Sequence, residues 1–193
     1  MSDKVALKIA IDLMHVPSQV RFFRSEPLPD GVALLLGIAA GDEGAEHAAA
    51  TLTDRSPDIV RRAATFFIEQ ILFAPNADSY QVLGVSPKAS PGELRRNVAL
   101  LLRWLHPDLD PHGERSIFIG RVTAAWNDLK TPERRAAYDD LRRSAGEKRK
   151  SRSGLRGNAK QKKRGGEASR IYRAERAGFL RRVWSVIFDR PLQ

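Results

Sequence analysis

Cysteine is absent from the 193 residues of the chain. This absence excludes a disulfide framework, a thiolate nucleophile and a cysteine-ligated zinc finger, and it suits a reducing compartment. Long apolar runs are also absent: the longest, residues 31–40, is far shorter than the ~20 residues that a membrane-spanning helix needs. The first residues lack the basic, apolar and small regions of a signal peptide. We therefore expect a soluble cytoplasmic protein.

The charged residues are unevenly distributed along the chain, whose formal net charge is +10. Residues 1–141 hold 16 basic and 19 acidic side chains, whereas residues 142–193 hold 17 basic and 4 acidic ones. The sequence therefore predicts a near-neutral body with a basic extension. It excludes a uniformly basic nucleic-acid-binding domain.

The first 77 residues divide into two parts. In residues 1–30, apolar side chains alternate over residues 5–13 as in a half-buried strand, and two prolines near the end favour an extended link. We expect this part to be a strand or extended. Residues 31–77 are expected to be a small helical domain, with helices near residues 31–39, 43–52 and from Pro57 onward.

Residues 78–141 contain clearer signals for where helices begin and end. A single helical turn is expected before Gly84, and Ser90 to Glu93 form a capping box. The helix behind this box ends before Pro107, and further helices are expected around residues 119–129 and after Pro132. Two long helices joined by a short turn pack antiparallel. The chain is therefore predicted to be all-α, with a helical hairpin at its centre.

The last quarter of the chain divides into a linker and a terminal segment. Residues 142–169 are rich in Gly, Lys and Arg and poor in apolar residues, which predicts a disordered basic linker. Residues 170–193 combine apolar side chains at roughly helical spacing with arginines, which predicts a basic amphipathic helix.

The turn between the two long helices holds the candidate chemistry. His106, Asp108, Asp110 and His112 alternate there, and imidazole and carboxylate groups at this spacing can converge on one cation. The competing interpretation is a polar turn, stiffened by prolines, whose side chains meet water. Because no further ligand pair accompanies the turn, we predict no metal and no cofactor.

Residues 78–141 resemble a J domain, the module shared by DnaJ-type co-chaperones. The resemblance covers about a third of the chain and rests on several short matches in the family's order and spacing. These are Tyr80 to Val85, Glu93 to Arg96, His106-Pro107-Asp108 directly after a helix, Ala125 to Leu129, and Pro132 to Asp139.

The resemblance implies that His106, Pro107 and Asp108 bind a DnaK-type heat-shock chaperone and stimulate its ATP hydrolysis. It also implies that Arg95, Arg96 and Arg103, on the helix before the tripeptide, meet the chaperone. The chain has no Gly-x-x-x-x-Gly-Lys-Ser/Thr loop for a nucleotide. We therefore expect a protein that is not an enzyme and acts by binding.

Compared with the family, the basic face of that helix is thinned. Ala99, Leu100 and Trp104 occupy positions on this helix where basic residues are common, and Leu109 follows the aspartate of the tripeptide, where Lys or Arg is frequent. Electrostatic steering mainly sets association rates and partner choice, so we expect weaker or more selective recruitment. We also expect Leu100 and Trp104, one turn apart, to pack against the N-terminal helical domain.

The terminal segment has three competing interpretations. It can bind an anionic membrane surface at the inner face of the membrane, bind a partner protein, or dock back on the body. The residues expected to bind are Arg173, Arg176, Phe179, Leu180, Arg181, Arg182, Trp184 and Phe188. The preceding linker lacks interleaved aromatics, so nucleic acid binding is expected to be non-specific at most.

The leading hypothesis is a co-chaperone whose J domain recruits a DnaK-type chaperone, with the flanking regions supplying an unknown client or the location. The alternative is an interaction or scaffold protein with a basic tail, whose J-like domain no longer recruits a chaperone. A metal-dependent hydrolase is the third and weakest hypothesis.

Overall fold

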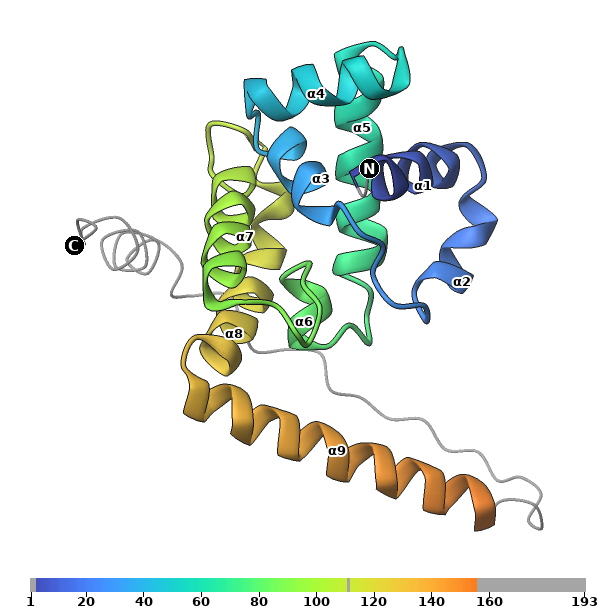
Figure 1. The fold of residues 1–193 in the computed structure, drawn as a ribbon, viewed down its shortest axis with the longest axis vertical. Coiled ribbons are helices and arrows are strands. Elements are labelled where there is room, and N and C mark those ends of the chain that lie inside the picture. Colours follow the sequence, from blue (N-terminus) through green and yellow to red (C-terminus); the bar gives the residue numbers. More distant parts are fainter. Residues whose placement is uncertain (1–2, 111, 156–193) are drawn as a thin grey trace. The chain divides into compact units, whose positions relative to one another are not determined.

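In the computed structural model, residues 3–110 and 112–155 are described, and their regular structure is entirely helical (Figure 1). The all-α prediction is therefore confirmed. In chain order the elements are α1 (Asp3–His15), the 3₁₀ turn η1 (Pro17–Gln19), α2 (Val20–Phe23), α3 (Val32–Ala39), α4 (Glu43–Thr53), α5 (Pro57–Phe67), the π-helical turn η2 (Ile68–Leu72), α6 (Ser79–Val82), α7 (Pro91–Trp104), the 3₁₀ turn η3 (Glu114–Phe118), α8 (Ile119–Leu129) and α9 (Pro132–Leu155).

The strand expected at residues 5–13 is wrong, because this stretch belongs to helix α1. The buried side chains are Ala6, Leu7, Ala10, Ile11 and Leu13, which recur mainly at helical spacing. The apparent alternation of large apolar residues ignored the two alanines, which lie on the buried face. When the alanines are counted as apolar, the buried residues form one face of a helix, which explains why this stretch is helical.

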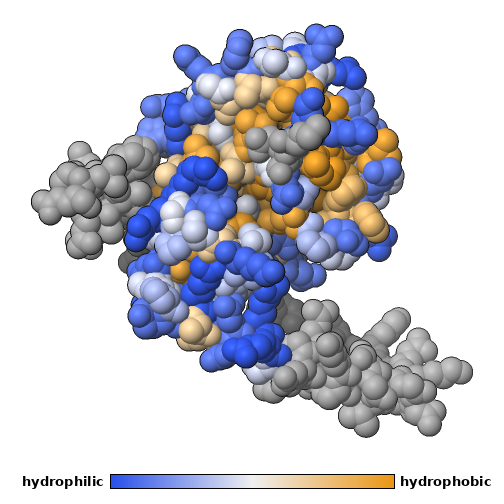
Figure 2. Space-filling view, viewed as in Figure 1, coloured by the Kyte–Doolittle hydropathy of each residue, from blue (hydrophilic) through white to orange (hydrophobic). Residues whose placement is uncertain are grey.

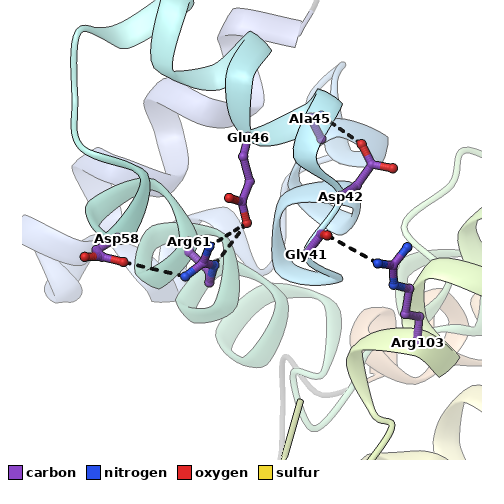
Figure 3. A network of polar contacts seen from close by, with 7 residues as sticks. All are labelled: Gly41, Asp42, Ala45, Glu46, Asp58, Arg61 and Arg103. Carbon is purple, nitrogen blue, oxygen red and sulfur yellow. Dashed lines mark hydrogen bonds and ion pairs between the residues drawn. The ribbon is translucent and has the colours of Figure 1, made fainter. Parts of the chain in front are cut away.

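The helices predicted near residues 31–39, 43–52 and from Pro57 are confirmed as α3, α4 and α5. Helix α5 packs against α1, α3 and α4, so it is the central helix of this N-terminal part (Figure 1). An ion pair links α5 to α4, with Arg61 Nη2 2.7 Å from Glu46 Oε1 (Figure 3). On the face shown in Figure 2, hydrophobic residues gather over these N-terminal helices.

Helices α6, α7 and α8 form the predicted central hairpin. The capping box at the start of α7 is present: Ser90 Oγ accepts the Glu93 amide at 3.2 Å, and Glu93 Oε2 accepts the Ser90 amide at 2.7 Å. Helix α8 packs against both α6 and α7. The start of α9 is tied to α6, because the Tyr138 hydroxyl accepts the Ser79 amide at 2.8 Å.

Helix α9 continues to Leu155, so the linker expected to begin at residue 142 is wrong for residues 142–155. Arginine, lysine, glutamate and alanine are good helix formers, and a helix extends readily from a first turn that is already held in place. The rest of the expected linker and the amphipathic helix at residues 170–193 lie outside the described residues. No described helix is both long and apolar enough to cross a membrane.

The N-terminal helices and the hairpin belong to one compact unit, which ends at Arg142. Helix α3 packs against α7. Trp104, at the end of α7, is only 1% exposed and stacks with Phe73, their ring centroids 6.0 Å apart. The predicted packing of Trp104 on the N-terminal part is therefore confirmed, and Leu100 is half-buried.

Glu69 of η2 lies at the same junction. Burial raises the pKa of this carboxyl; the nearby Arg115 opposes the shift, and Glu114 and Asp110 add to it. The junction therefore holds a carboxylate whose ionised form is disfavoured in the folded protein.

Replacing Gly84 by alanine is expected to destabilise the protein by about 1–3 kcal/mol. Gly84 has φ +64°, and an added Cβ would lie 2.9 Å from Val32 Cγ1 of α3. Urea denaturation measures the effect. The control is Gly120→Ala on α8, where an added Cβ has nothing within 4 Å. The control is expected to be neutral or stabilising by up to about 1 kcal/mol; equal effects would contradict the close packing of α3 on Gly84.

Replacing Glu69 by glutamine is expected to stabilise the protein at pH 7. Because the folded pKa is raised, the carboxyl disfavours folding once pH rises through that pKa, and the penalty disappears below the unfolded value, about 4.3. Thermal melts from pH 4 to pH 8 should therefore show a gain that grows with pH. The control is Glu26→Gln, on an exposed loop. A less stable Glu69→Gln protein at pH 7 would mean that attraction to Arg115 outweighs burial.

Candidate functional site

The turn after α7 presents the tripeptide His106-Pro107-Asp108. The helix stops at Trp104 because Pro107 has no amide hydrogen and disfavours helical backbone at the residue before it. The His106 carbonyl accepts the amides of Leu109 at 2.9 Å and Asp110 at 3.1 Å. These two bonds close a tight turn around the tripeptide, and the Asp108 side chain on it is 86% exposed.

His106 and Asp108 also contact each other directly. His106 Nδ1 lies 3.3 Å from the Asp108 amide nitrogen and 3.3 Å from Asp108 Oδ2. When Nδ1 accepts the amide hydrogen, a neutral ring carries its proton on Nε2. Both side chains are exposed enough for solvent to weaken the ionic part of the contact. The surface of the turn therefore carries an exposed carboxylate next to a partly exposed imidazole.

Asp110 and Arg115 hold the far end of the turn. Asp110 is 8% exposed, and its Oδ2 accepts the Arg115 amide at 2.8 Å. The Arg115 guanidinium donates to the Leu109 carbonyl at 3.0 Å and lies 5.0 Å from the centre of the Trp104 ring. Asp110 thus supports the turn from inside, although the sequence had grouped it with the candidate metal ligands.

The metal hypothesis finds no support in these contacts. Within residues 3–110 and 112–155 there is no group of three or more histidine, cysteine, aspartate or glutamate side chains that could hold a metal ion. Asp108 points to solvent, whereas Asp110 is buried and bonds to Arg115. The carboxylates of Asp108 and Asp110, which alternate with the histidines in the sequence, therefore do not converge on one point in the structure.

The three arginines of α7 have different surroundings. Arg95 and Arg96 are exposed near the start of the helix. Arg103 is also exposed, but its Nη2 donates to the Gly41 carbonyl at 3.3 Å, at the corner between α3 and α4 (Figure 3). Because Arg96 and Arg103 are seven residues apart, they lie on one helix face. The structure therefore joins the basic face to the N-terminal helices at its end nearest His106.

Sequence reasoning missed Arg115 and Arg121, which connect the hairpin to its surroundings. Arg121 of α8 donates to the carbonyls of Phe73 at 2.6 Å and Ala74 at 2.7 Å. Neither arginine stands in a recognisable motif, and their acceptors are backbone carbonyls that any residue can supply. Only the tertiary arrangement identifies them. The residues expected to bind a membrane or partner, Arg173, Arg176, Phe179, Leu180, Arg181, Arg182, Trp184 and Phe188, lie outside the described residues.

Comparison with known proteins places this turn in a known domain. The family model described as DnaJ domain matches residues 78–139. Chaperone protein DnaJ 1 of Mycobacterium leprae is 42% identical over 66 residues, which cover 34% of this chain and 17% of that protein. Chaperone protein DnaJ of Rickettsia africae is 36% identical over 75 residues, covering 39% of this chain and 20% of that protein. No solved structure matches the chain significantly.

The chain spans about a fifth or less of the length of these curated relatives, and the similarity is confined to the segment with the hairpin and its turn. Within that segment the predicted capping box and the helix ending before Pro107 are present, and the structure shows Asp108 exposed. Residues 78–139, about a third of the chain, therefore match the DnaJ domain in sequence and carry its helical hairpin and turn.

Proposed function

We propose that the protein is a co-chaperone whose J domain binds a DnaK-type chaperone and stimulates its ATP hydrolysis. The observation that carries this proposal is the exposed Asp108 on a tight, proline-stiffened turn at the end of α7. The match of residues 78–139 to the DnaJ domain supports it. The relatives named as DnaJ chaperones support it over the same segment.

The residue types suit this task. An exposed carboxylate accepts two parallel hydrogen bonds from an arginine, and such charge-assisted pairs are short and directional. His106 lies beside this carboxylate, with its Nδ1 3.3 Å from the Asp108 amide nitrogen, and adds an imidazole to the surface of the turn. Pro107 limits the backbone conformations of the turn, which lowers the entropy lost on binding. The protein itself catalyses nothing in this proposal and acts on the ATPase cycle of its partner by binding.

The exposed arginines of α7 would steer the partner electrostatically toward the turn. Arg95 and Arg96 supply positive charge on the helix that leads to the turn. Arg103 shares its guanidinium with the Gly41 carbonyl, so less of its hydrogen-bonding capacity remains for a partner. We infer that steering depends mainly on Arg95 and Arg96. The regions outside residues 78–139 would determine the client and the location.

Asp108→Asn is expected to lower the stimulation of a DnaK-type ATPase at least about tenfold. A hydrogen bond to a charged group contributes about 1.5–3 kcal/mol, and asparagine keeps the shape of the side chain but loses the charge. Single-turnover ATP hydrolysis by the chaperone measures this effect.

The matched control is Asp54→Asn, which removes an exposed carboxylate at the end of α4, where the backbone is left-handed and asparagine is tolerated. It should stimulate like the wild type. A wild-type protein that fails to stimulate would favour the alternative, an interaction protein whose J domain does not recruit a chaperone. Equal stimulation by wild type and Asp108→Asn would exclude Asp108 as the main contact.

Arg96→Glu is expected to slow association with the chaperone several-fold at low salt, and the difference should shrink as ionic strength rises. Stopped-flow association rates at two salt concentrations measure this effect. The control is Arg62→Glu, an exposed position on α5 with the same charge change. An equal loss in both variants would mean that the net charge of the protein, rather than the face of α7, steers the partner.

A further inference from the structure

We propose that Phe73, which lies outside the DnaJ domain, is a positioning residue for the His106-Pro107-Asp108 turn. The expected effect of Phe73 on chaperone binding rests on the proposed function. The positioning itself is a property of the free protein. It assigns a role to the N-terminal helices: they hold the turn in its binding conformation.

The first step is the aromatic cluster formed by Phe73, Trp104 and Phe118. The Phe73 ring stacks on Phe118 at a centroid distance of 4.4 Å and an interplanar angle of 10°, and on Trp104 at 6.0 Å and 9°. Trp104 is two residues before His106, and Phe118 is five residues after Gly113, where the turn ends. One ring from the N-terminal part therefore contacts both chain segments that enter and leave the turn.

The second step is that Phe73 is itself held by the hairpin. Arg121 donates to the Phe73 and Ala74 carbonyls, and its guanidinium carbon lies 5.6 Å from the centre of the Phe73 ring. Phe73 is 4% exposed. Its backbone and its ring are thus both fixed, so it can restrain its neighbours and does not simply follow them.

The third step connects the cluster to the turn. Arg115 lies over the Trp104 ring, donates to the Trp104 carbonyl at 3.5 Å, and donates to the Leu109 carbonyl at 3.0 Å. Leu109 follows Asp108 directly, and its amide closes the turn on His106. A shift of the Trp104 ring would therefore move the guanidinium that holds the carbonyl next to Asp108.

The expected effect on chaperone affinity follows from the fraction of molecules whose turn is in the binding conformation. When only part of the molecules hold the turn in the binding conformation, the apparent affinity falls by that fraction, while saturating partner still selects the competent form. Loss of positioning therefore raises the concentration needed for half-maximal stimulation and leaves the maximum intact. Loss of a contact that acts on the hydrolysis step of the partner itself lowers the maximum instead.

The test compares Phe73→Leu with Phe67→Leu in the full chain. Phe67 is fully buried on α5, and leucine removes a ring from the core in both variants, so similar losses in melting temperature are expected. Phe73→Leu alone should speed hydrogen exchange at the amides of Leu109, Asp110 and Arg115 at least threefold. It should raise the half-stimulating concentration by a similar factor, with the maximal rate kept within twofold.

Unchanged exchange at these amides in Phe73→Leu, or equal acceleration in both variants, would overturn the proposal. A lowered maximum with an unchanged half-stimulating concentration would also overturn it, since that result places the effect on the hydrolysis step of the partner and not on the population of the turn. If the wild type does not stimulate a DnaK-type chaperone, the proposed function fails, and the exchange measurement on the free protein still decides whether Phe73 positions the turn.

Discussion

The contact on which the arrangement of this protein depends is the stacking of Phe73 with Trp104 and Phe118. Trp104 stands at a position that the resemblance had marked as commonly basic and partner-facing, yet its ring is almost fully buried. An exposed tryptophan on a lone hairpin would leave a large apolar surface in water. Because Phe73 covers it, the N-terminal helices and the hairpin share a core, and the compact unit extends through Arg142.

Because of this shared core, some side chains of α7 contact the N-terminal helices and others remain exposed to solvent. Trp104 is used for packing, and Arg103 bonds to the Gly41 carbonyl, whereas Arg95 and Arg96 remain exposed. The apolar residue at position 104 of the basic face is therefore explained by the packing of α7 on Phe73. In the proposed function, recognition of the partner rests on fewer charges and on a turn whose carboxylate is 86% exposed. Such a surface relies on geometry more than on long-range attraction.

Local signals predicted much of the fold, and tertiary contacts decided the rest. The capping box of α7 and the helix ending before Pro107 depend on near neighbours, and sequence patterns encode them. The strand expected at residues 5–13 was wrong because the alternating residues also fit a helix once alanine counts as buried. Arg115 escaped notice because its acceptors are backbone carbonyls, which leave no trace in the sequence.

The segment that matches the DnaJ domain is shorter than the set of residues that support the His106-Pro107-Asp108 turn. The match begins at residue 78, but Glu69 and Phe73 precede it: Glu69 interacts with the charge of Arg115, and Phe73 stacks on Trp104. A core residue restrains its neighbours whether or not it belongs to the recognised domain, because close packing transmits displacements across the contact. Properties carried over from relatives that share only residues 78–139 would omit this restraint. The N-terminal helices are thus part of the environment that determines how the turn behaves.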